Sequence, residues 1–77
     1  MEIKDFIQNF ADQFDDTDAS VFTPETVFHE LDEYSSLIAL SIIAMVDEEY
    51  GVTIGANEMR ASVTIQDLFD QVQAKIE

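Results

Sequence analysis

Apolar residues recur at helical spacing in two segments, and this periodicity constrains the fold more than any other feature of the chain. The spacing predicts one amphipathic helix over residues 2–14 and another over residues 64–76. The residues of the two stripes are Ile3, Phe6, Ile7, Phe10 and Phe14, then Ile65, Leu68, Phe69, Val72 and Ile76. Thr64 precedes the second stripe, and Asp67 occupies the third helical position, as is typical of a helix start. Each segment is expected to bury one face.

Regular helices are also what the composition favours, because the 77 residues include no cysteine. A core of this size rarely supplies more than about 3–5 kcal/mol of net stability, and neither disulfides nor thiolate metal sites are available to add to it. One Pro and two Gly leave no room for a linker. We therefore expect one all-α domain over residues 1–77, monomeric and, in the absence of a signal-peptide pattern, cytoplasmic.

The middle of the chain completes a small bundle of three main helices plus a short helix. Residues 36–50 have the length of a helix, Gly51 ends it as a left-handed cap, and residues 56–61 form the short helix. Between positions 37 and 46 only Ser41 is polar. One broad stripe is expected to face the core, with a second stripe nearly opposite. The first stripe is Leu37, Leu40, Ile43, Val46 and Tyr50, and the second is Ile38, Ile42 and Met45.

Residues 15–35 are expected to form a long loop. Turn-forming residues fill positions 15–20, and Thr23 followed by Pro24 indicates a short helical turn near residues 24–31. The acidic start of this loop invites comparison with a calcium-binding loop. Counted from Asp16, however, the sixth and twelfth positions hold valine, where calcium loops need Gly and Glu. No metal site is expected.

The charge of the chain indicates its partners. Asp and Glu number 17 against three basic residues, giving a formal net charge of −14. Nucleic acid is excluded because phosphates would repel this surface, and anionic membranes are excluded for the same reason. Membrane insertion is not expected either, because the apolar run 37–46 is far shorter than the roughly 20 residues that a span requires. Partners are expected to carry basic patches.

An enzyme is not expected. His29 is the only imidazole, cysteine is absent, and the carboxylates are too many for any pair to indicate acid–base chemistry. His29 is expected at the rim of the short turn. Ser36, at the start of the middle helix, is a candidate for covalent modification because a first-turn hydroxyl is exposed. Taken alone, its position is more typical of a helix cap.

The order of elements, together with several residues, resembles the acyl carrier protein family. The matching positions within about residues 6–72 are Leu31, Ser36-Leu37, Asp47 to Ile54 and Thr64 to Asp67. The resemblance implies that Ser36 receives a 4′-phosphopantetheine arm from coenzyme A, transferred by a separate phosphopantetheinyl transferase. The arm would carry acyl, or possibly aminoacyl, groups as thioesters to acyl-transferring or acyl-activating enzymes of lipid, fatty-acid or secondary-metabolite biosynthesis. Ser35 is the minor alternative for attachment and the better candidate for the cap.

Three departures from the family pattern surround Ser36. Ser35 replaces the family's aspartate, Ile38 and Ser41 replace acidic residues, and one extra residue lies between Leu31 and Ser36. A partner with a basic or apolar docking patch is therefore expected. The expected docking residues are Ser35, Leu37, Ile38, Ser41, Met45, Asp47 and Glu48. For Ile38 and Met45 the alternative is burial against neighbouring helices. For the whole chain the alternative is an acidic helical interaction module that is never modified.

Overall fold

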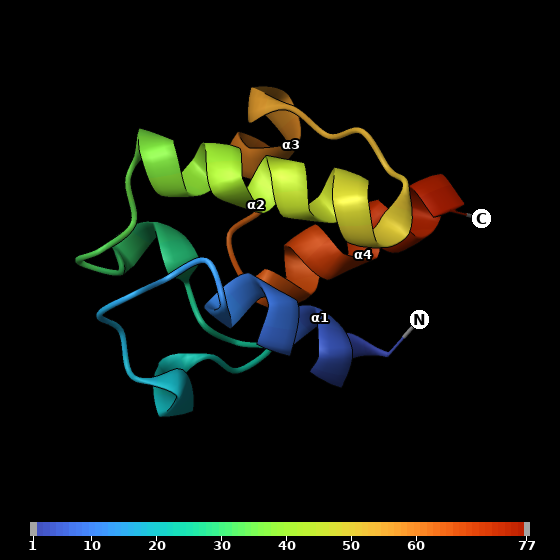
Figure 1. The fold of residues 1–77 in the computed structure, drawn as a ribbon. Helices are drawn as coiled ribbons and strands as arrows, with labels where there is room; N and C mark the ends of the chain where they lie inside the picture. The colour runs from blue at the N-terminus through green and yellow to red at the C-terminus, as the bar shows by residue number, and fades with distance from the viewer. Residues whose placement is uncertain (1, 77) are drawn as a thin grey trace.

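Four α-helices and two short 3-10 turns make up residues 2–76, the part of the chain that the computed structural model describes (Figure 1). The elements are α1 (Ile3–Ala11), η1 (Ala19–Val21), η2 (Phe28–Glu30), α2 (Ser36–Tyr50), α3 (Ala56–Ala61) and α4 (Ile65–Ile76). Within these residues no strand forms, and the predicted all-α bundle of three main helices and one short helix is confirmed. None of these helices combines the length and the apolar character needed to cross a membrane.

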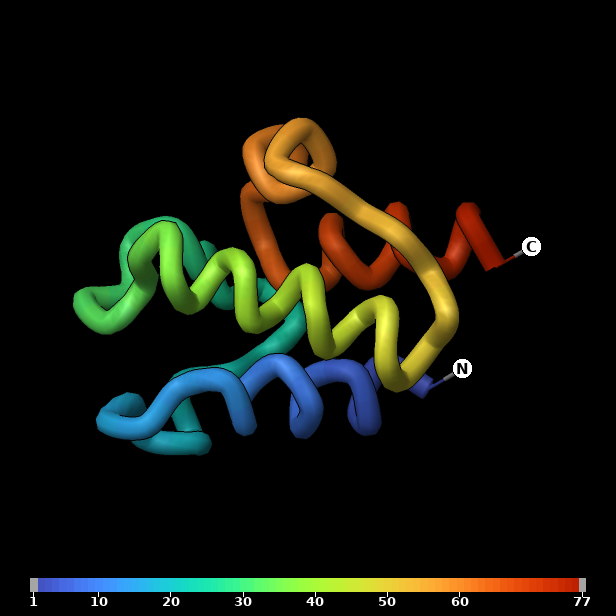
Figure 2. Tube along the Cα trace, turned by 45° about the horizontal axis from the view of Figure 1, so that its top comes forward, coloured from blue at the N-terminus to red at the C-terminus, as the bar shows by residue number. Residues whose placement is uncertain are grey.

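The α1 helix contacts both α2 and α4, and α3 contacts α4. Figures 1 and 2 both show α2 between α1 and α3. The long segment from residue 12 to residue 35 crosses the end of the bundle at which α2 begins (Figure 2). The start of α2 therefore lies among loops and short turns.

Phenylalanine forms the centre of the core. All six phenylalanines are buried: Phe6, Phe10, Phe14, Phe22, Phe28 and Phe69. The Phe10 ring lies 5.6 Å from Phe14 and 5.3 Å from Phe28, centroid to centroid, and Phe6 lies 5.5 Å from Phe69. Each aromatic side chain buries a large apolar area, and contacts between the rings add further stabilisation. This cluster therefore offsets the small size of the core.

The first helix ends earlier than the predicted residue 14. After Ala11 the backbone tightens, because the Gln13 and Phe14 amides donate to carbonyls only three residues back, at 3.1 and 3.0 Å. Phe14 still reaches the core and is 7% exposed. The Glu33 carboxylate then accepts the amides of Asp15 and Asp16, at 2.7 and 3.0 Å, and turns the chain away. The helical spacing of apolar residues extends to Phe14, beyond the end of the helix. The tighter 3-10 turn still directs the Phe14 side chain into the core.

The predicted helical turn near residues 24–31 forms only over η2. Thr23 and Pro24 do not start a helix. Instead, the carbonyls of Pro24 and Thr26 accept the amides of Gln66 and Ile65, at 3.0 and 3.1 Å. These amides belong to the first turn of α4 and lack partners within that helix. The loop therefore completes a helix start instead of forming a helix of its own.

The face of α2 that enters the core differs from the prediction. Ile42 and Val46 are 0% exposed and Met45 is 5% exposed, whereas Leu37 and Leu40 are 73% and 62% exposed. Of the predicted core stripe, only Val46 is fully buried, while Ile43 and Tyr50 are half-buried. The helix is apolar nearly all round, so its own pattern could not select the buried side.

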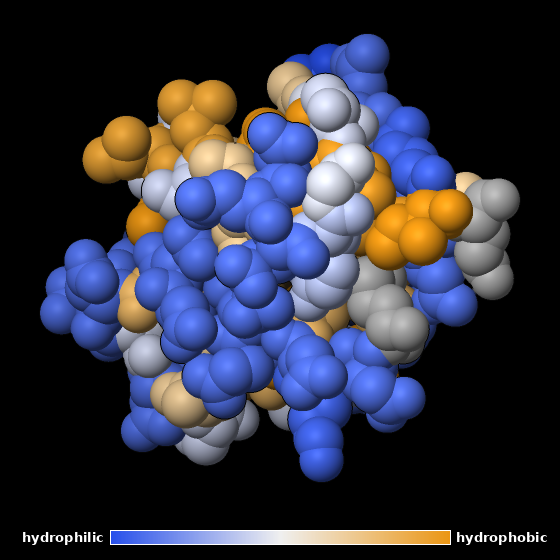
Figure 3. Space-filling view, turned by 45° about the vertical axis from the view of Figure 1, so that its right-hand side comes forward, coloured by the Kyte–Doolittle hydropathy of each residue, from blue (hydrophilic) through white to orange (hydrophobic). Residues whose placement is uncertain are grey.

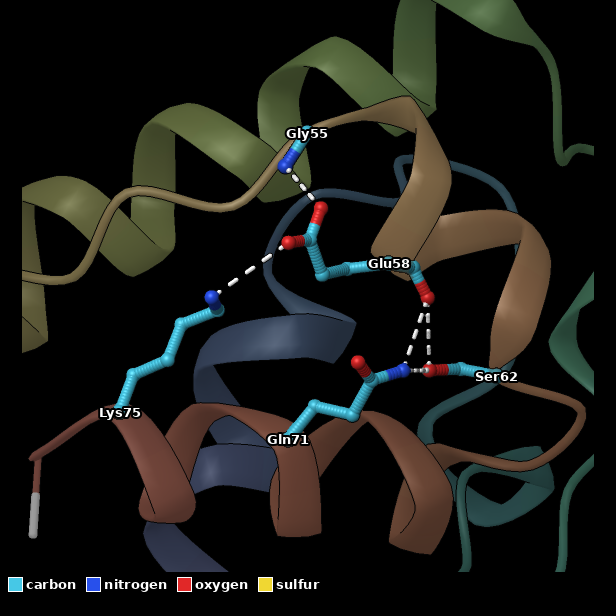
Figure 4. A network of polar contacts seen from close by, with 5 residues as sticks. All are labelled: Gly55, Glu58, Ser62, Gln71 and Lys75. Atoms are coloured by element: carbon cyan, nitrogen blue, oxygen red, sulfur yellow. Dashed lines mark hydrogen bonds and ion pairs between the residues drawn. The ribbon is translucent and has the colours of Figure 1, made fainter.

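A polar network fastens α3 to α4 (Figure 4). Glu58 Oε1 accepts the Gly55 amide at 2.9 Å, and its Oε2 lies 3.4 Å from Lys75 Nζ. Gln71 Nε2 donates to Ser62 Oγ at 2.7 Å and to the Glu58 carbonyl at 3.1 Å. The hydrogen bond from the Gly55 amide lowers the pKa of Glu58. Apolar anchoring of this short helix comes from Met59, which is 3% exposed.

Candidate functional site

Two adjacent serines have different structural roles at the start of α2. Ser35 is the N-cap: its backbone is extended, and its Oγ accepts the Ile38 amide at 3.3 Å. Ser36 is the first helical residue, and its side chain is exposed. The prediction that Ser35 rather than Ser36 caps the helix is confirmed. The Ser36 hydroxyl is therefore at the surface and not needed to hold the helix terminus.

A cleft of about 390 Å³ opens beside Ser36, between α2 and α3. Its lining is mainly apolar and includes the first residues of α2. The lining residues are His29, Tyr34, Ser35, Ser36, Ala39, Leu40, Ile43, Ala56, Met59 and Arg60. The volume and lining are within the range of sites that hold small apolar ligands. An apolar group attached near Ser36 could leave water here.

His29 also lines this cleft and contacts the end of α3. Its Nε2 lies 2.9 Å from both the Met59 and the Ser62 carbonyl oxygens, at the last turn of α3. Two acceptors require that Nε2 carries the proton and donates. The imidazole also packs against Phe28, with ring centroids 4.3 Å apart, and against Tyr34, at 5.1 Å. The lone histidine thus lies at the rim of η2, as expected from the sequence, and fastens α3 to the turn before α2.

Glu33 and Tyr34 lie in the short stretch between η2 and α2. The Tyr34 ring packs edge-on against Phe28 at 5.4 Å, and partial burial raises its pKa. Glu33 accepts a hydrogen bond from the Thr17 hydroxyl at 2.7 Å in addition to those from two loop amides. These hydrogen bonds lower the pKa of Glu33, and the bond from Thr17 has the largest effect. These two residues therefore connect the long loop and η2 to the start of α2.

The structure brings only some of the expected docking residues to the surface. Ser35, Leu37, Asp47 and Glu48 are exposed, and Ser41 is half-buried in a groove between α1 and α2. Met45 was expected in this surface and is instead buried, so that expectation is wrong. Ile38 is half-buried and packs against the core. For both apolar residues the alternative of burial between helices describes the structure better.

Leu40 is an exposed apolar residue that the sequence analysis assigned to the core. The exposed face of α2 runs from Leu37 through Leu40 and Ala44 to Asp47, at successive helical steps of three and four residues. Asp47 could have revealed this face, because a carboxylate marks the solvent side and Leu40 lies two turns before it. The amino-terminal half of the face is apolar and the carboxyl-terminal half acidic.

Polar residues cover much of one side of the molecule, with separate hydrophobic groups between them (Figure 3). A second hollow lies under the long loop and is lined partly by Asp16, Asp18, Asp32 and Glu33. Within residues 2–76, no three His, Asp or Glu side chains converge in a geometry suited to a metal ion.

Comparison of the chain with models of known protein families, with curated proteins and with solved structures gave no significant match. The functional interpretation therefore depends on the residues around Ser36 and on the cleft.

Proposed function

We propose that the protein is an acyl carrier protein whose 4′-phosphopantetheine arm is attached to Ser36. The observation that carries the proposal is the division of roles at the start of α2. Because Ser35 supplies the cap, the exposed Ser36 hydroxyl is available beside an apolar cleft. The proposal includes a cytoplasmic location and no catalytic role for the chain itself.

The residues present fit such a group. Modification requires the Ser36 oxygen to attack the pyrophosphate of coenzyme A, forming an O–P bond while adenosine bisphosphate leaves and the transferase takes the hydroxyl proton. The exposed position of Ser36 gives a transferase access without unfolding the helix. When attached, the arm supplies the thiol that this chain without cysteine lacks. Ala39, Ile43 and Met59 give the adjacent cleft an apolar lining.

Partner enzymes are proposed to dock on the exposed face of α2. Leu37 and Leu40 present an apolar surface next to Ser36, and Asp47 and Glu48 present charge further along the helix. A partner with an apolar depression near its active-site entrance and basic residues about two turns away would complement this face. Docking can be weak, because the arm makes each later encounter effectively intramolecular.

The replacement of the family's aspartate by Ser35 is compatible with this function. Both residue types accept a backbone N–H at an N-cap, and Ser35 does so with the Ile38 amide. The helix start that presents Ser36 is therefore kept, while one negative charge beside the attachment point is lost.

A mass measurement tests the proposal. The purified protein is incubated with coenzyme A and a promiscuous phosphopantetheinyl transferase, and intact mass is compared for wild type, Ser36→Ala and Ser35→Ala. Wild type and Ser35→Ala should gain the mass of one phosphopantetheine group, and Ser36→Ala should gain none. A gain that survives Ser36→Ala would move the site to Ser35.

The exposed pair Leu37 and Leu40 also favours a second candidate, an interaction module that is never modified. Absence of any mass gain in wild type would select this candidate. In that case the same face of α2 would bind a basic, partly apolar partner directly.

A further inference from the structure

Arg60 is a cation without an acidic partner in a strongly acidic chain. It is the only arginine, and acidic residues outnumber basic ones 17 to three. Its guanidinium donates to Asn57 Oδ1 at 2.5 Å. Within residues 2–76 the one ion pair joins Lys75 to Glu58, so no carboxylate of this part of the chain neutralises Arg60. Most of its five N–H donors remain available.

The cleft that Arg60 lines contains no acidic side chain. Asp and Glu make up 17 of the 77 residues, yet none is among the ten residues of the lining. Among residues 2–76, Arg60 is therefore the only permanently charged group that lines the cleft. A cavity of this composition suits an apolar ligand that also bears an anionic group.

Contacts of α3 place its last turn, which includes Arg60, against the segment that leads into Ser36, and both residues line the same cleft. The carbonyl of the preceding residue, Met59, lies 2.9 Å from His29 Nε2, and the His29 ring packs 5.1 Å from Tyr34. Tyr34 directly precedes the two serines at the start of α2. The last turn of α3 is thus fastened to the segment that leads into Ser36, whereas Ala56 begins α3 at its other end.

We propose that Arg60 binds the phosphodiester that joins Ser36 to its arm and so directs the arm into the apolar cleft between α2 and α3. This inference rests on the proposed attachment at Ser36. A guanidinium presents paired N–H donors that match two phosphate oxygens, which a lysine ammonium cannot do in the same way. The contact also offsets the repulsion between a new anion and a chain of net charge −14. Arg60 is a positioning residue and takes no part in thioester chemistry.

Nuclear magnetic resonance of the unloaded and loaded protein tests the proposal directly. The Arg60 Nε–Hε resonance of wild type should shift on loading, and the shift should shrink in 0.5 M salt, since the Debye length falls to roughly 4 Å. In loaded protein, the phosphorus resonance should move in Arg60→Gln and move less in Arg60→Lys. Lys4→Gln is the matched control: it removes the same charge from an exposed site on α1 and should leave the phosphorus resonance in place.

The outcomes separate the two proposals. If wild type gains no mass with coenzyme A and transferase, both the attachment and the Arg60 contact are wrong. If it loads but the Arg60 Nε–Hε resonance does not move, only the Arg60 contact is wrong. Equal phosphorus shifts in wild type and Arg60→Gln would also overturn it. The comparison of unloaded and loaded wild type needs no substitution, so it does not depend on how the variants fold.

Discussion

Replacing Ile42 and Leu40 separately by alanine tests which face of α2 is buried. Ile42 is 0% exposed and Leu40 is 62% exposed. Truncating a buried isoleucine to alanine costs about 2–5 kcal/mol. A domain of 77 residues has about 4–12 kcal/mol of stability at the usual value per residue, so a loss of about 3 kcal/mol in Ile42→Ala should remove a quarter or more of it. Leu40→Ala should cost less than about 1 kcal/mol, because the side chain is mostly solvated and alanine favours the helix.

Urea denaturation followed by far-ultraviolet circular dichroism measures both free energies of unfolding. We expect about 3 kcal/mol for Ile42→Ala, with a fall in melting temperature of about 4–8 °C per kcal/mol. The slope against urea should match wild type in both variants, which shows that only stability has changed. Equal destabilisation by the two variants, or a larger effect of Leu40→Ala, would refute the assignment and restore Leu40 to the core. Met45→Ala and Leu37→Ala test the same difference between a buried and an exposed side chain of α2 at two other positions.

The two other predictions concern helix starts. Ser35→Ala should destabilise the protein by about 1 kcal/mol through loss of the α2 cap, and Ser36→Ala by less than about 0.5 kcal/mol; the reverse order in urea denaturation would make Ser36 the cap. Asp67 accepts hydrogen bonds from the Thr64 and Val63 amides. These bonds lower the pKa of Asp67 below its ordinary value, and the bond from Thr64 has the largest effect. A lowered carboxyl pKa adds stability above the unfolded value and loses it as pH falls through the folded value. The stability gap between wild type and Asp67→Asn should therefore be widest near neutral pH and should narrow as the pH falls through the lowered folded-state pKa of Asp67; a gap that stays constant across the acid range would contradict this reasoning.

The proposed function depends on α2 having two differently used sides. Ile42 and Val46 fix the helix to the core, and Leu37 and Leu40 leave an apolar surface exposed next to Ser36. In a chain of net charge −14, this exposed apolar pair beside the exposed Ser36 hydroxyl is a place where an apolar partner surface would meet few charges. If Leu40→Ala folds normally but weakens docking of a partner enzyme, the two sides of the helix will have been separated experimentally.

Much of the fold could be predicted from local signals. The short helix at residues 56–61 has the predicted bounds, and the start of α4 follows from Thr64 and Asp67, which exchange hydrogen bonds at 3.1 Å. The left-handed conformation of Gly51, with φ of 66°, ends α2 where expected. These features are decided within a few residues by capping and backbone preference, so neighbouring sequence is enough to predict them.

Two expectations failed because distant contacts decided the outcome. Pro24 and Thr26 were expected at a helical turn, but their carbonyls are used by amides of α4, about 40 residues further along the chain. No local pattern contains that pairing. The end of α1 moved for a similar reason, since the carboxylate of Glu33 captures the amides that follow Phe14.

The sequence alone determined that this chain forms helices, where α2 begins and ends, and which of its serines caps it. These outcomes depend on hydrogen bonds between near neighbours, so they are encoded locally. Only the tertiary structure decided which side of α2 is exposed. That helix is apolar nearly all round, and its orientation is set by packing of Ile42, Met45 and Val46 against the phenylalanine core. The tertiary structure also brought Arg60 and His29 to the cleft beside Ser36, because residues far apart in sequence meet only when the helices pack.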